Sequence, residues 1–159
     1  MTLEYFTGYN AFLLFIPILI WNGLLFHKLP QSIKSDPKEM PRYLFRGETI
    51  LRVAVFGFPF LIPLNYNSDF FYRGLTLYTI GLVIYYSSWL PLMIKPESNL
   101  TKKLIIWTAP AWTPSIFLAG ITILSESLVY GIFSSMFIGA HLYHEVVRYK
   151  IIFNKEKNQ

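Results

Sequence analysis

Two short groups of ionisable residues stand out in a sequence with only 14% charged residues. Glu48 and Arg52 are four residues apart, and His141, His144 and Glu145 lie within five positions of one another. Residues three or four apart share one face of an α-helix, so each group would present its side chains on one side. We expect Glu48, Arg52, His141 and His144 to face one another across the protein interior.

An acid–base site is one chemistry that these residues support. In surroundings of low polarity a glutamate holds its proton more tightly unless a neighbouring arginine keeps it ionised. A histidine beside it can act as the opposite partner in proton transfer. Glu48 and His141 are therefore the candidate catalytic residues, and the substrate would be lipid-like.

A metal site is the less favoured alternative. His141, His144 and Glu145 offer three ligands on one helix face, and Glu48 could add a fourth from an earlier helix. Zinc or iron accepts such donors. Two histidines three residues apart beside a glutamate also arise by chance. The sequence therefore predicts no metal, keeps these residues as weak candidate ligands, and identifies no cofactor.

Ligand binding is the interpretation that we favour over catalysis. Polar and aromatic residues accompany the charged groups near one end of the apolar segments, and helices that turn these faces inward would enclose a cavity with aromatic walls. The expected ligand is an amphipathic or lipid-like small molecule. The predicted ligand-binding residues are Arg52, Asn22, Tyr85, Tyr86, Trp89, Trp112, His144 and Glu145.

The elements that must position these residues are long apolar helices. Hydrophobic residues make up 53% of the 159 positions. A helix that crosses a lipid bilayer needs about 20 mostly apolar residues. Five segments have this length, at residues 5–26, 43–64, 70–94, 104–124 and 127–147. The sequence therefore predicts a single all-α domain over residues 1–159, a polytopic membrane helix bundle of five transmembrane helices in a lipid bilayer.

The positions of lysine and arginine predict the orientation of this bundle. They collect between the first two segments, between the third and fourth, and after the fifth, while the other loops carry few. Cytosolic loops retain basic residues, so we expect the N-terminus outside, the C-terminus in the cytosol, and a multi-pass location such as a bacterial plasma membrane. The net charge of +5 is spread between apolar segments, which argues against a nucleic-acid partner.

Two further features bear on function. The chain has no cysteine, which excludes disulfides, thiolate nucleophiles and Cys-ligated metals. Gly131, Ser135 and Gly139 recur every four residues, a stripe that favours close helix packing inside the bundle or in a homodimer. We expect a membrane protein that binds, and in one version transports, an amphipathic molecule. A membrane-embedded enzyme and an accessory subunit of a membrane complex are the alternatives.

Overall fold

The computed structural model describes residues 10–26, 41–94 and 111–157, and all regular elements within them are helical. This confirms the predicted all-α class. Two of the elements are short 3-10 helices, each continuous with an α-helix. In chain order the elements are η2 (Ala11–Phe15), α1 (Ile16–Phe26), α2 (Arg42–Gly57), η5 (Phe58–Leu61), α3 (Phe71–Ile94), α5 (Pro114–Ser125) and α6 (Leu128–Lys157).

Proline accounts for two departures from the predicted segment boundaries. The second segment changes from α-helix to 3-10 helix around Pro59, because proline lacks the N–H that an α-helix requires. The fourth segment becomes helical at Pro114, a residue that suits the first turn; residues 104–110 lie outside the described part. The fifth helix continues to Lys157, well past the predicted end at residue 147.

The helices were also expected to cross a membrane. Within the described residues, however, no helix combines the length and the apolarity that a crossing needs. The five transmembrane helices therefore stay a prediction.

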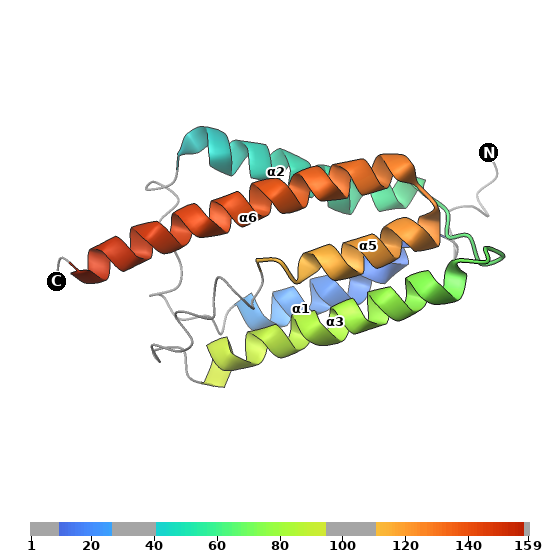
Figure 1. The fold of residues 1–159 in the computed structure, drawn as a ribbon, viewed down its shortest axis with the longest axis horizontal. Coiled ribbons are helices and arrows are strands. Elements are labelled where there is room, and N and C mark those ends of the chain that lie inside the picture. The colour runs from blue at the N-terminus through green and yellow to red at the C-terminus, as the bar shows by residue number, and fades with distance from the viewer. Residues whose placement is uncertain (1–9, 27–40, 95–110, 158–159) are drawn as a thin grey trace.

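Successive helices alternate in direction and form two layers (Figure 1). One layer holds α2 and α6, and the other holds α1, α3 and α5. The most extensive packing joins α3 to α5, α2 to α6, and α5 to α6. Backbone hydrogen bonds from Ala11 to Ile62 (2.9 Å) and from Asn65 to Leu124 (3.0 Å) tie the segments together at one end.

The core between the layers is apolar. Its most buried side chains come from different helices, so burying them in one cluster holds the bundle together. None of the following is more than 2% exposed: Phe15, Ile18, Val55, Phe117, Leu118, Ile121, Leu124 and Tyr130.

Glycine sets the close approach between α3 and α5. A Cβ atom on Gly81 would lie 2.5 Å from the backbone nitrogen of Phe117, and one on Gly120 would lie 2.5 Å from that of Tyr78. No real Cβ atom tolerates such distances. The two glycines therefore permit a backbone contact that any side chain would block.

The small-residue stripe predicted on α6 is divided between two surroundings. Gly131 packs against Thr122 of α5, which confirms packing inside the bundle for that residue. Ser135 and Gly139 are exposed, and an added Cβ on Gly139 would meet nothing within 4 Å. The homodimer predicted through the stripe of Gly131, Ser135 and Gly139 stays a prediction.

Candidate functional site

The buried face of α2 carries a carboxylate at a core position. Leu44, Glu48, Leu51 and Val55 follow the four-three-four spacing of an apolar stripe, and α2 packs against α6. Glu48 occupies one position of this stripe with only 2% of its surface exposed. Removing a carboxylate from water costs several kcal/mol unless positive or hydrogen-bonding groups compensate. Glu48 therefore needs partners from its own helix and from α6.

The facing helix, α6, carries polar residues at its own buried positions. Ser134, Phe137, His141 and Glu145 are all buried, at the spacing of one helix face. Phe137, the apolar residue of this row, supports His141, because the rings of the two residues stack with centroids 5.3 Å apart. This ring contact orients the imidazole towards α2.

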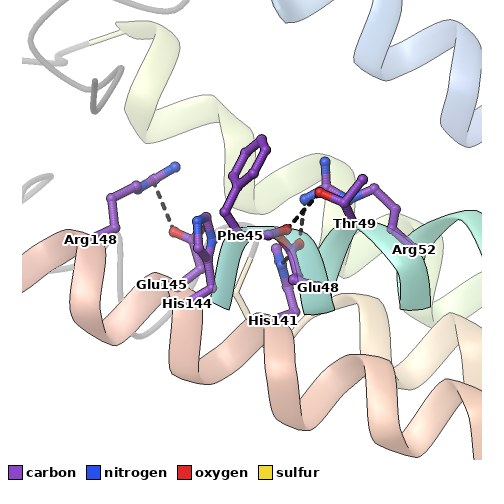
Figure 2. Close-up of polar contacts among 8 residues, drawn as sticks. All are labelled: Phe45, Glu48, Thr49, Arg52, His141, His144, Glu145 and Arg148. Carbon is purple, nitrogen blue, oxygen red and sulfur yellow. Dashed lines mark hydrogen bonds and ion pairs between the residues drawn. The ribbon is translucent and has the colours of Figure 1, made fainter. Parts of the chain in front are cut away.

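Glu48 is the centre of the contacts between the two helices (Figure 2). Its Oε1 accepts a hydrogen bond from the Arg52 guanidinium and lies 2.9 Å from Nδ1 of His141. Its Oε2 lies 3.7 Å from Nδ1 of His144. These contacts confirm the predicted convergence of Glu48 and the two histidines across the interior, whereas Arg52 joins them through Glu48 of its own helix. Arg52 is the outermost member, with half of its side chain exposed.

Glu145 extends the same cluster along α6. Its Oε1 lies 3.6 Å from Nδ1 of His144, and its Oε2 lies 3.0 Å from the guanidinium of Arg148, close enough for an ion pair but without hydrogen-bond geometry. Nδ1 of His144 is buried and has no hydrogen-bond partner among the described residues. We call the set Glu48, Arg52, His141, His144, Glu145 and Arg148 the charged seam.

Four of the other predicted ligand-binding residues form a second group on α1 and α3: Asn22, Tyr85, Tyr86 and Trp89. The hydroxyl of Tyr85 donates a hydrogen bond of 2.6 Å to Oδ1 of Asn22, and the ring of Trp89 lies edge-on to that of Tyr85 at 6.1 Å. Tyr86 packs on Trp21 with centroids 4.4 Å apart.

Trp112 and the described hollow lie elsewhere. Trp112 is in the turn before α5, is 38% exposed, and its carbonyl accepts hydrogen bonds from the backbone and side chain of Ser115.

A hollow of about 550 Å³ lies near the turn between α5 and α6, and its walls are mostly apolar. It is lined by Phe70, Arg73, Thr122, Ile123, Glu126, Ser127 and Leu128. Enclosure of a ligand beside the charged seam stays a prediction.

Sequence reasoning did not anticipate a polar cluster at the turn between α5 and α6. Glu126 adopts a left-handed backbone conformation with φ of 48° and accepts hydrogen bonds from the hydroxyl of Ser68 and from Asn65, the latter at 2.9 Å. These two bonds hold the pKa of Glu126 below its usual range. The available signal was a glutamate between two serines where one apolar segment ends and the next begins.

The charged seam offers two kinds of chemistry. A carboxylate in contact with an imidazole can pass a proton to or from a bound molecule, and two imidazoles that converge on one carboxylate can bind a metal ion. Buried ionisable groups with specific partners are commoner at functional sites than elsewhere. No family model, curated protein or solved structure matches this chain.

Proposed function

We propose that this protein is an integral membrane helix bundle that binds a small amphipathic molecule at the charged seam. The single observation that carries the proposal is the buried contact of Glu48 with His141. Burying two ionisable groups at a helix interface costs free energy because both leave water. An apolar pair at the same positions would hold the two helices together without that cost. Their presence is explained if the seam recognises a polar group.

Membrane embedding is supported by the outer surface of the helices. Large apolar side chains are exposed on every α-helix of the described residues except α5, and a soluble monomer rarely exposes an apolar surface so extensive. Lipid would be the matching solvent for these side chains. Examples that are more than half exposed are Ile20, Leu24, Ile50, Val53, Val83, Ile94, Leu128, Val129, Ile132 and Met136.

The expected orientation, with the N-terminus outside and the C-terminus in the cytosol, is supported by where the charged residues lie on the alternating helices. Arg42 and Arg46 are at the start of α2, and Arg148 and Lys150 are in the later half of α6, which lies at the same end of the bundle (Figure 1). The opposite end carries Glu126 in addition to acidic and basic residues near the start of α3. Basic residues favour the cytosolic side.

The ligand class follows from the chemistry of the charged seam and of the aromatic group. The charged seam would hold a polar or ionised head, and the aromatic residues Tyr85 and Trp89 of α3 would contact an apolar body. A second candidate function, acid–base catalysis on the same molecule, is favoured by the 2.9 Å contact between Glu48 and His141, which is within hydrogen-bond distance for proton transfer.

Single cysteines test the orientation cleanly, because the natural chain has none. Asn67→Cys lies in the exposed loop before α3, and Lys150→Cys lies on an exposed position of α6. In intact cells a membrane-impermeant maleimide should label Asn67→Cys, and should label Lys150→Cys only after permeabilisation. Equal labelling of both cysteines in intact cells would contradict the proposed membrane arrangement.

Mass spectrometry of co-purified molecules tests binding. We expect one amphipathic species to be enriched with the wild-type protein and lost from Glu48→Gln and His141→Ala. Tyr143→Phe is the matched control, because Tyr143 is on the same helix but 54% exposed. The same lipid mixture in all four proteins would argue against a specific ligand at the seam.

A further inference from the structure

We propose that Glu48, His141 and His144 are the three protein ligands of one divalent transition-metal ion, of the zinc and ferrous-iron class. The inference deepens the proposed function and rests on it, because it places the ion in the seam where the ligand's polar group would bind. The fourth coordination position would then belong to water or to that polar group, as in catalytic zinc sites.

The positions of the donor atoms support this assignment. One nitrogen from each histidine and one oxygen of Glu48 all lie within 4.8 Å of one another. Ligands in a tetrahedral zinc site with bonds of about 2.0–2.1 Å are separated from one another by about 3.4 Å. Nδ1 of His141 lies 2.9 Å from Oε1 of Glu48, and Nδ1 of His144 lies 3.7 Å from Oε2, so the two imidazoles approach different oxygens of one carboxylate. The site would be completed by closing the widest of these separations, at most 4.8 Å, to about 3.4 Å.

The donor set also selects the class of ion. Two imidazole nitrogens with one carboxylate oxygen suit zinc and ferrous iron, whereas magnesium and calcium prefer oxygen donors alone. Nδ1 of His144, buried and without a hydrogen-bond partner among the described residues, is the kind of atom that a metal ion would satisfy. At His141 the ion would replace the proton that the contact with Glu48 requires.

Charged residues around the site would change its affinity for the metal ion. Arg148 pairs with Glu145, and Oε1 of Glu145 lies 3.6 Å from Nδ1 of His144, so this carboxylate would add negative charge beside the ion. Arg52 acts in the opposite sense, because its guanidinium occupies the same oxygen of Glu48 that faces His141. Half of the Arg52 side chain is exposed, so the guanidinium can move into solvent when an ion binds.

Zinc titration of purified, chelator-treated protein tests the inference. We expect one Zn²⁺ per chain, no competition from Mg²⁺, and a Kd at least about tenfold weaker in His141→Ala, in His144→Ala and in Glu48→Gln. Tyr143→Phe and Glu126→Gln are the controls and should keep the wild-type Kd. Wild-type protein that binds no Zn²⁺, or ligand variants that bind it as tightly as the controls do, would overturn the proposal.

Arg52→Gln keeps all three metal ligands, so it still tests the site if the ligand variants fail to fold. Removing the competing guanidinium should make Zn²⁺ binding tighter than in the wild type, whereas a purely structural ion-pair network would gain no metal affinity. An unchanged or weaker Kd would count against the site. Zinc binding without any co-purified amphipathic molecule would refute the proposed function but not the metal site. A co-purified amphipathic molecule without zinc binding would refute the metal site alone.

Discussion

Nδ1 of His141 lies 2.9 Å from Oε1 of Glu48, although 93 residues separate them in the sequence. The contact joins α2 to α6, which together form one layer of the described part of the bundle (Figure 1). It is therefore both a link between two helices and the centre of the candidate site.

Replacing Glu48 by alanine should destabilise the protein strongly. His141 would lose its hydrogen-bond partner in the interior, whereas half-exposed Arg52 can be solvated, so we expect a loss of about 1–3 kcal/mol. Thr49→Ala on the exposed side of the same helix is the control and should change stability by less than about 1 kcal/mol. Denaturant titration of the purified protein, followed by circular dichroism, measures the difference. Equal stability of the two variants would mean that the contact is not formed in solution.

The approach of α3 to α5 gives a second prediction. In Gly81→Ala and in Gly120→Ala the new Cβ atom would meet backbone atoms at 2.5 Å, so the helices must separate, and we expect a loss of about 1–3 kcal/mol. Gly23→Ala is the matched control, since nothing lies within 4 Å of its added Cβ. Alanine should be neutral or slightly favourable there. Thermal unfolding midpoints would separate the two classes, and similar midpoints for Gly81→Ala and Gly23→Ala would refute the close contact.

The helices could be predicted from the sequence because length and apolarity act locally. Each of the five apolar segments contains a described helix, and departures occur where one residue changes the backbone, as at Pro59 and Pro114. The register of α3 against α5 could not be predicted. Apolar segments give no signal for which glycine meets which backbone, and the contacts of Gly81 and Gly120 depend on tertiary packing.

The candidate site was within reach of sequence reasoning for a different reason. A charged residue at a core position of an apolar stripe, as at Glu48, indicates that its partners lie on the neighbouring helix. Spacing alone placed His141 and Glu145 on one face of α6. The pairing of α2 with α6 could not be predicted from that spacing, and neither could the separate group around Tyr85.

The hydrogen bond between Tyr85 and Asn22 gives a third prediction. Tyr85→Phe would leave Oδ1 of Asn22 without its donor at the contact between α1 and α3, and we expect a loss of about 1–3 kcal/mol. Tyr143→Phe removes the same hydroxyl from an exposed position and should have almost no effect. Chemical denaturation of both variants measures the difference. Matching unfolding curves for the two would show that the bond contributes nothing to stability.

The turn between α5 and α6 predicts how stability depends on pH. Hydrogen bonds from Ser68 and then Asn65 favour the ionised form of Glu126, so the pKa of this carboxyl is lower in the folded protein than in the unfolded chain. A group with a depressed folded pKa stabilises the protein fully above its unfolded pKa of about 4.3, and this contribution is lost as the pH falls through the folded value.

Glu126→Gln removes this titration while keeping the shape of the side chain. We therefore expect the unfolding midpoint of the wild type to exceed that of Glu126→Gln at neutral pH, and the gap to narrow as the pH falls below about 4.3. Ser68→Ala should reduce the gap at neutral pH, because the hydroxyl makes the largest contribution to the lowered pKa. Scanning calorimetry from pH 3 to pH 7 would follow the gap. A gap that is constant over this range, or that widens on acidification, would show that Glu126 does not hold the turn through its charge.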